Sequence, residues 1–138
     1  MLQLLKLFFM FIWQLPQNII GTICSIKADT YRSIFAKDNE LIVVYFKPWF
    51  RSAVSLGDII IMDNLLWDQP AGDFDNDLNH EHGHQIQSRI LGPLYLPIIG
   101  LLSLLGNIVF RIFKIKSKYY YKLPWEWWAD KLGGVKRE

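Results

Sequence analysis

The sequence predicts an α+β fold, in which a small antiparallel sheet packs on a histidine-bearing helix and on a second helix near the carboxyl end. Short runs of β-branched and aromatic residues between 31 and 62 are typical of strands. A polar segment with all three histidines of the chain follows at 73–90, and apolar segments occupy 1–26 and 91–113. With 138 residues, the chain is expected to form a single domain.

Composition narrows the class of protein. Hydrophobic residues make up 51% of the chain and charged residues 20%, a balance too apolar for intrinsic disorder. The formal net charge of +2 is too small a surplus to bind a nucleic-acid backbone, so nucleic acid is not an expected partner. The one cysteine, Cys24, excludes an internal disulfide framework and a cysteine-rich zinc module.

The amino-terminal segment 1–26 is expected to form an apolar helical anchor. Its one basic residue is Lys6, and the apolar pattern breaks around Pro16. The break leaves arms of about 13 and 10 residues, each shorter than the roughly 20 apolar residues that cross a bilayer. We therefore expect a helical hairpin that enters one leaflet of a membrane.

Residues 27–72 are expected to hold the sheet. Strands are predicted at 31–37, 40–46 and 58–62. Asp38 and Asn39 supply a turn between the first two strands. The last strand comes shortly before the histidine segment, so we expect it at the sheet edge, where an extended peptide can pair with it.

The segment 73–90 is predicted to be a helix that carries the chemistry. His80, Glu81 and His84 form the pattern H-E-x-x-H. Residues four apart lie one turn above each other, so the two imidazoles aim at one point and can share a metal ion. Glu81, one position on, can take a proton from a water beside that ion. Gly83 costs about 1 kcal/mol of helix propensity, which indicates that another backbone packs closely there.

A catalytic zinc takes three protein ligands, so a third is needed. The helix expected at 123–134 supplies Glu126, which can complete the site. Asp130 lies one turn further on and can accept a hydrogen bond from the far nitrogen of a ligating histidine, fixing its tautomer. Ala129 between them is small enough to let the two helices approach.

Simpler interpretations remain open for these residues. His82 lies about 200° around the helix from His80, so it is not expected to bind the same ion. It is then a surface residue, or an alternative ligand if the segment is not helical. Glu126 and Asp130 alone are equally typical of a solvated helix face. Their occurrence together with the histidine pattern favours the metal site.

The segment 91–113 is uncharged until Arg111 and is long enough to cross a bilayer. A single crossing would put His84 and Glu126 on opposite sides, where no shared site could form. We therefore expect its glycines and prolines to fold it as a short hairpin beside the first one. Nearby basic residues favour the cytoplasmic face, or form an ordinary solvated surface. They are Arg111, Lys114, Lys116, Lys118 and Lys122.

The two motifs together, H-E-x-G-H at 80–84 and E-x-x-A-D-x-L-G at 126–133, resemble those of the gluzincin metallopeptidases. The similarity is closest to the M48 group of membrane-bound zinc peptidases, in a minimal form, and covers about 79–85 and 125–133. The resemblance implies Zn²⁺ as the cofactor. It also implies His80, His84 and Glu126 as ligands, Glu81 as catalytic base and Asp130 as the acceptor beside a ligand.

The expected function is therefore that of a membrane-associated, zinc-dependent metallopeptidase. Its partners would be a peptide or protein substrate and membrane lipid, with the site on the cytoplasmic side of an inner membrane. Tyr119, Tyr120 and Tyr121 offer an oxyanion donor, but they suit an interfacial aromatic belt equally well. A non-catalytic zinc-binding protein and a small structural membrane protein are the alternatives.

Overall fold

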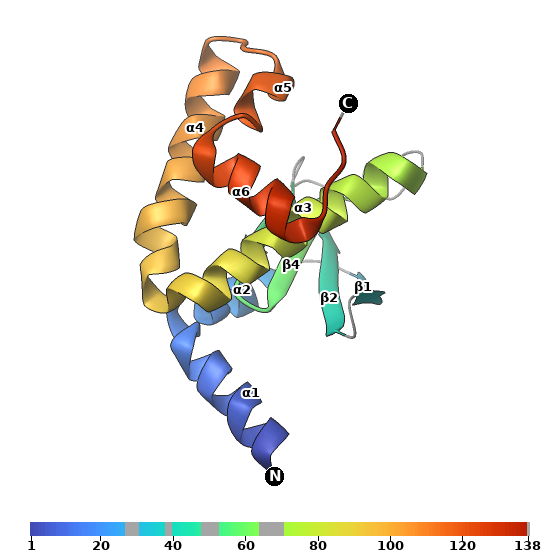
Figure 1. The fold of residues 1–138 in the computed structure, drawn as a ribbon, viewed down its shortest axis with the longest axis vertical. Coiled ribbons are helices and arrows are strands. Elements are labelled where there is room, and N and C mark those ends of the chain that lie inside the picture. The colour runs from blue at the N-terminus through green and yellow to red at the C-terminus, as the bar shows by residue number, and fades with distance from the viewer. Residues whose placement is uncertain (27–30, 38–39, 48–52, 64–70, 138) are drawn as a thin grey trace.

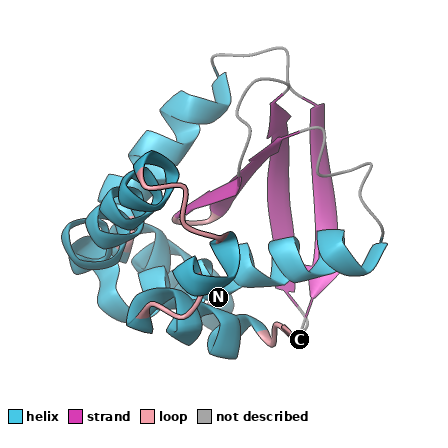
Figure 2. Cartoon of the chain, turned by 90° about the horizontal axis from the view of Figure 1, so that it is seen from above, coloured by secondary structure: helices cyan, strands magenta, loops and turns pink. Residues whose placement is uncertain are grey.

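The computed structural model describes residues 1–26, 31–37, 40–47, 53–63 and 71–137. In that part of the chain, helices and a four-stranded sheet make an α+β fold, as predicted. The strands gather on one side of the molecule and most of the helices on the other (Figure 1, Figure 2). The turn predicted at 38–39 lies outside the described residues.

The amino-terminal segment forms two helices, α1 (Leu2–Trp13) and α2 (Leu15–Ile26). They meet at an angle of 83°, so the segment is a bent pair and the predicted hairpin is wrong. Pro16 lies in the first turn of α2, where a missing N–H is tolerated, so it begins a helix and does not reverse the chain. Nε2 of Gln14, at the bend, donates to Asp58 over 3.2 Å and ties the bend to the sheet.

The sheet is mixed, with the strand order β1-β2-β4-β3. Its strands are β1 (Tyr31–Lys37), β2 (Glu40–Lys47), β3 (Ala53–Leu56) and β4 (Ile59–Asp63). The outer pairs are antiparallel, but β2 and β4 run parallel, with Val44 opposite Ile60. The prediction of an antiparallel sheet is therefore wrong. Strands β3 and β4 form an antiparallel hairpin, so the chain reverses its direction between them. After this reversal, β4 runs in the same direction as β2.

The short strand β3 was not predicted, and it changes which strand lies at the edge. Its sequence, Ala-Val-Ser-Leu, is too short for a clear alternation of apolar and polar residues. It follows β4 in the sheet order, so β3 is an edge strand of the described sheet and the predicted strand 58–62 is internal. The hairpin turns at Gly57, whose φ of +66° favours glycine.

Helix α3 (Ala71–Leu91) covers the predicted segment 73–90 and packs on the sheet. Phe74 and Leu78, one turn apart, meet side chains from both parallel strands. The core cluster consists of Ile42, Val44, Ile60, Met62, Phe74 and Leu78. The polar motif of α3 lies beyond this cluster, toward its carboxyl end. The sheet therefore fixes the helix that carries the histidines.

The chain bends after α3 and continues as an apolar arm. A 3-10 turn (Gly92–Leu94) and a π-helical turn (Leu96–Gly100) lead into α4 (Leu101–Ile112), at 114° to α3. The arm runs in one direction (Figure 1), so the hairpin predicted within 91–113 is wrong. Its prolines each lie in the first turn of a helical segment, where they begin a helix and do not fold the chain back.

The reversal that a shared site requires comes after α4. Lys114 has a φ of 51°, in the left-handed region, directly after this helix. Helices α5 (Ser117–Tyr120) and α6 (Pro124–Gly133) then bring the chain back against α3 (Figure 1). Helix α6 matches the predicted segment 123–134 within one residue at each end.

Glycines allow α3 and α6 to touch through their backbones. A Cβ at Gly83 would lie 1.9 Å from the carbonyl oxygen of Ala129, and one at Gly133 would lie 1.9 Å from that of Asn79. The close approach predicted from Gly83 is confirmed, and Ala129 is fully buried between the helices. This contact sets the distance between the histidines and Glu126.

Helices α1 and α4 contain no buried residue. Within the described residues, no single helix is long and apolar enough to cross a membrane. Two bent pairs, α1 with α2 and α3 with the arm that ends in α4, reach the required length and composition together.

Candidate metal centre

Helix α3 places two imidazoles and a carboxylate on one side of the molecule. The rings of His80 and His84, one turn apart, have centroids 4.7 Å apart and an angle of 84° between their planes. Both histidines and Glu81 are buried. The spacing of four residues therefore brings the two imidazole rings together on one side of α3, as predicted.

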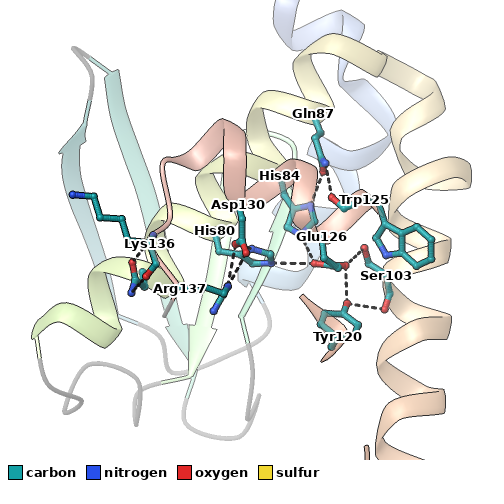
Figure 3. Close-up of polar contacts among 11 residues, drawn as sticks. His80, His84, Gln87, Ser103, Tyr120, Trp125, Glu126, Asp130, Lys136 and Arg137 are labelled. Carbon is teal, nitrogen blue, oxygen red and sulfur yellow. Dashed lines mark hydrogen bonds and ion pairs between the residues drawn. The ribbon is translucent and has the colours of Figure 1, made fainter. Parts of the chain in front are cut away.

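Helix α6 brings Glu126 to that point. Oε2 of Glu126 lies 3.1 Å from Nε2 of His80 and 3.2 Å from Nε2 of His84 (Figure 3). One ligand atom from each of these three residues lies within 4.8 Å of the others, so the cluster could hold a metal ion. The structure thus brings together the three residues predicted as ligands, although Glu126 follows His84 by 42 residues along the chain.

The other carboxylate oxygen of Glu126, Oε1, accepts hydrogen bonds from side chains outside α3. The hydroxyl of Ser103, on α4, donates to Oε1 over 2.5 Å, and the hydroxyl of Tyr120 donates to it over 2.8 Å (Figure 3). Burial and the neighbouring Glu126 raise the pKa of Tyr120 well above its usual value, so its hydroxyl stays a donor. These bonds turn Oε2 toward the imidazoles.

The outer nitrogen of His80 is bound by Asp130. Nδ1 of His80 donates to Oδ1 of Asp130 over 2.7 Å. Arg137 in turn binds both carboxylate oxygens of Asp130, at 2.7 and 3.0 Å, and stacks 3.4 Å above the ring of Tyr121. The structure therefore places Asp130 at the far nitrogen of a histidine, as predicted, and adds Arg137 behind it.

The tautomer of His84 is set by a glutamine. Nε2 of Gln87 donates to the carbonyl of Trp125 over 2.8 Å, so Oε1 of Gln87 accepts the proton of His84 Nδ1 over 2.7 Å. Nε2 of a neutral His84 then carries a lone pair, and it faces Oε2 of Glu126, which also only accepts. Two acceptors 3.2 Å apart repel each other unless a proton or a metal ion lies between them, so this contact can form part of a cation site.

The pKa values of His80 and Glu126 also indicate a site for positive charge. Burial alone would lower the pKa of His80, but hydrogen bonds with Asp130 and Glu126 raise it to about 9. Burial would raise the pKa of Glu126, but hydrogen bonds from His80 and His84 hold the pKa well below its usual value. The site therefore stabilises positive charge beside an ionised carboxylate, whether a proton or a metal ion supplies it.

The spacing of the ligand atoms suits a small divalent ion. Bonds of about 2.0–2.2 Å from zinc to nitrogen and oxygen put neighbouring ligand atoms of a tetrahedron about 3.3 Å apart. The two nitrogen–oxygen distances of 3.1 and 3.2 Å are close to that value. The donor set of two imidazoles and one carboxylate leaves a fourth position for water or substrate.

Glu81 is buried beside the cluster with an unsatisfied oxygen. Within the described residues, its Oε2 has no hydrogen-bond partner. Burial raises the pKa of this carboxyl above its ordinary value, although both histidines of the motif oppose the shift. A carboxylate in this setting accepts a proton readily when a water molecule lies next to it.

A cavity of about 780 Å³ opens beside these groups. One wall is formed by Glu81 and by His80, His84 and Glu126, which we call the metal-ligand cluster. Strand β3 forms a second wall and α4 a third. The edge strand that borders it is β3, which corrects the prediction that 58–62 would do so. The buried hydroxyl of Ser55, on β3, also lacks a partner within the described residues.

His82 points away from this cluster, as its position on the helix predicts. It is buried, which corrects the alternative of a surface residue, and its Nδ1 lies 3.1 Å from Oε1 of Gln85. Among the three tyrosines, Tyr119 is exposed, while Tyr120 and Tyr121 line the cavity.

Sequence reasoning missed the polar groups that hold the ligands. They are Gln87, Ser103, Tyr120 and Arg137. Gln87 carries a usable signal, because it lies one turn after His84 on the same helix. Ser103 stands out as a hydroxyl in an otherwise apolar stretch, but nothing in the sequence places it beside Glu126.

Comparison with protein-family models, with curated proteins and with solved structures gives no match for this chain. The resemblance to gluzincins therefore stays a prediction. The centre is described by its own geometry, which assigns it the capacity to hold a metal ion and leaves the identity of that ion to experiment.

Proposed function

We propose that this chain is a zinc-dependent peptidase that hydrolyses peptide bonds at the His80, His84 and Glu126 cluster. One relationship carries the proposal. Nε2 of His84 lies 3.2 Å from a carboxylate oxygen of Glu126, and the buried side chain of Glu81, whose Oε2 has no hydrogen-bond partner among the described residues, borders the same cavity. A cation site beside a proton acceptor is the arrangement that water-activated hydrolysis requires.

Zinc is the ion that this donor set favours. Two neutral imidazoles and one carboxylate form a common ligand set of catalytic zinc, whereas magnesium and calcium prefer oxygen ligands alone. Bound there, zinc would polarise the scissile carbonyl and lower the pKa of a nearby water.

The chain's own residues supply the proton transfers. Glu81 takes a proton from the attacking water as the water oxygen bonds to the carbonyl carbon. The carbon–nitrogen bond then breaks, and the protonated carboxyl of Glu81 passes that proton to the leaving amine. The raised pKa of Glu81 suits this role, because the carboxyl must hold the proton between the two steps. Asp130 and Gln87 keep the histidine rings in the tautomers that the site needs.

A peptide is the substrate class that the walls of the cavity favour. Strand β3 borders the cavity at the edge of the described sheet, so an extended peptide can add to it as a further strand. Such pairing would hold the main chain across the cavity between β3 and α3. The backbone of any sequence can pair in this way, so β3 selects for extended peptides and leaves the choice of side chains to the other walls.

The proposed place of action is a membrane surface. Helix α2 buries Gln17 and Asn18 but leaves Ile19 and Ile23 exposed by 48% and 54%. This arrangement is the reverse of a helix in water, which turns its apolar face inward. Helices α1 and α4 add exposed leucine and phenylalanine side chains, and large apolar patches of this kind indicate a lipid or protein contact.

Positive charge beside the apolar arm favours lipid as the partner. The segment between α4 and α6, which includes α5, carries exposed lysines that suit the anionic headgroups of a cytoplasmic leaflet. They are Lys114, Lys116, Lys118 and Lys122. Because the two helix pairs are bent by 83° and 114°, we propose that the protein contacts the membrane with one face and that no helix crosses the bilayer.

A second candidate function is that of a metal-binding protein without catalysis. The hydrogen bonds that favour it join three helices through Glu126, which contacts α3 by its histidines and α4 by Ser103. In that case the ion ties the fold together and Glu81 has no chemical role.

Metal analysis and proteolysis of three matched variants separate these candidates. The proposed peptidase binds one zinc and cleaves peptides, loses most zinc in His84→Ala, and keeps zinc but loses cleavage in Glu81→Gln. Asp75→Asn, an exposed carboxyl on the same helix, serves as the control and retains both properties. Zinc binding without cleavage in the wild type, across a library of unfolded protein substrates, would favour the non-catalytic candidate.

A further inference from the structure

Helix α4 carries a polar stripe along an otherwise apolar surface. Ser103, Asn107 and Arg111 are spaced four residues apart, so they lie on one face of the helix. All three line the cavity beside the metal-ligand cluster. An apolar helix that turns its polar residues toward a cavity presents them to whatever occupies that cavity.

The charges of the cavity wall are arranged unevenly. Asp77, Glu81 and Glu126 make the inner part acidic. Arg111 is the one lysine or arginine among the described residues that line the cavity, and it forms no ion pair with a described residue. A carboxylate that enters the cavity is therefore repelled along α3 and attracted at the end of α4.

Helix geometry gives the distance from this cation to the cluster. Ser103 contacts Glu126 directly. Arg111 lies eight residues further along α4, which is about 12 Å at 1.5 Å per residue. An extended peptide covers about 3.3 Å per residue, so this distance corresponds to three or four peptide residues.

We propose that Arg111 is a specificity-determining residue, which binds a carboxylate located three or four residues from the scissile bond of an otherwise apolar peptide. This inference rests on the proposed function, since it takes the metal-ligand cluster as the place of cleavage. The remaining cavity wall along α4 is apolar and fits the rest of such a peptide. It is formed by Leu101, Leu104 and Ile108.

The neighbouring lysines do not share this position. Lys116 and Lys118 are exposed near the same end of the arm, but they do not line the cavity. Arg111 is thus the cation that a bound peptide meets, whereas the lysines face outward. Removal of one lysine offers a control with the same change of net charge.

The test uses dye-labelled apolar nonapeptides in which one glutamate is moved through every position, each matched with its glutamine counterpart. Binding is measured by fluorescence anisotropy with the zinc-loaded Glu81→Gln chain, alone and combined with Arg111→Gln or Lys116→Gln. We expect a preference of about fivefold for glutamate at one offset. Arg111→Gln should abolish this preference while zinc content and the affinity for the glutamine peptides stay unchanged, and Lys116→Gln should retain it.

Several results would overturn the inference. The preference could survive Arg111→Gln, fall equally in Lys116→Gln, or be missing because no peptide binds. A specific loss of binding to anionic phosphatidylglycerol vesicles in Arg111→Gln, with the peptide preference intact, would instead assign Arg111 to a lipid surface. Failure of the proposed function is a separate outcome: the peptides bind with the Arg111-dependent preference, but the wild-type chain does not cleave them.

Discussion

Oε1 of Gln87 accepts a hydrogen bond from Nδ1 of His84 over 2.7 Å, and Oε1 of Gln85 lies in the same relation to His82 at 3.1 Å. Both pairs are buried on α3 and span three residues. Only the first pair includes a residue of the metal-ligand cluster. The helix therefore contains a natural comparison between a glutamine that orients a candidate ligand and one that orients a structural histidine.

Replacing Gln87 with leucine should weaken zinc binding about tenfold to a hundredfold, because His84 loses the acceptor that holds its tautomer and orientation. The measurement is competition for zinc with a chromophoric chelator. Gln85→Leu removes an equivalent bond from His82 and should leave the affinity within about twofold. Equal losses in the two variants would mean that the effect comes from general disruption of α3.

Gly83→Ala should destabilise the fold by about 3 kcal/mol or more, because the added methyl group would overlap the backbone of Ala129, which is fully buried between the two helices. Urea unfolding of the metal-free chain measures the change. Gly72→Ala is the matched control on the same helix, since nothing lies within 4 Å of a Cβ there. That variant should keep or slightly raise the stability, by up to about 1 kcal/mol.

Zinc binding at pH 8 should release a proton from His80. The pKa of this residue is raised to about 9 in the metal-free chain, so the ring is protonated at pH 8 and must lose that proton to bind a metal. Zinc affinity should then rise with pH and level off above about 9. Calorimetry in buffers of different ionisation enthalpy counts the protons, in the Glu81→Gln background so that Glu81 does not contribute.

Asp130→Asn provides the comparison for this proton count. Without the carboxylate at Nδ1, the pKa of His80 should fall, so the ring is neutral at a lower pH and fewer protons leave at pH 8. A proton release that is unchanged in Asp130→Asn would contradict the assignment to His80.

Binding to phosphatidylcholine vesicles with phosphatidylglycerol should depend on the outward face of α2. Ile19→Ser combined with Ile23→Ser should weaken partitioning at least about tenfold, because each isoleucine transfers apolar area out of water. Ile34→Ser, at an equally exposed isoleucine on β1, should change nothing. A flotation assay measures the bound fraction. Equal binding of all variants would contradict the proposed membrane contact.

Much of the fold near the cluster could be predicted from local signals. Helix α3 follows from the spacing of His80 and His84, and helix α6 from Pro124 at its start and Gly133 at its end. The contact between these helices follows from Gly83. Each of these features depends on residues within a few turns of one another, which is the range over which helix propensity and capping act.

The rest depends on contacts between distant segments. The parallel pairing of β2 and β4 follows from the strand β3, whose four residues have too little pattern to reveal it. The direction of the arm was missed because a proline in a sequence can end one helix or begin the next. Ser103 and Arg137 reach the cluster only after the chain has bent and returned, so their roles could not be read from spacing.

The central claim is that His80, His84 and Glu126 jointly bind one divalent ion. Anomalous diffraction at the zinc absorption edge, from crystals of the full chain grown with zinc, tests it most directly. We predict one strong peak at about 2.0–2.2 Å from Nε2 of His80, Nε2 of His84 and Oε2 of Glu126. A zinc-free cluster with Glu126 hydrogen-bonded to both histidines, or a peak on other residues, would contradict it.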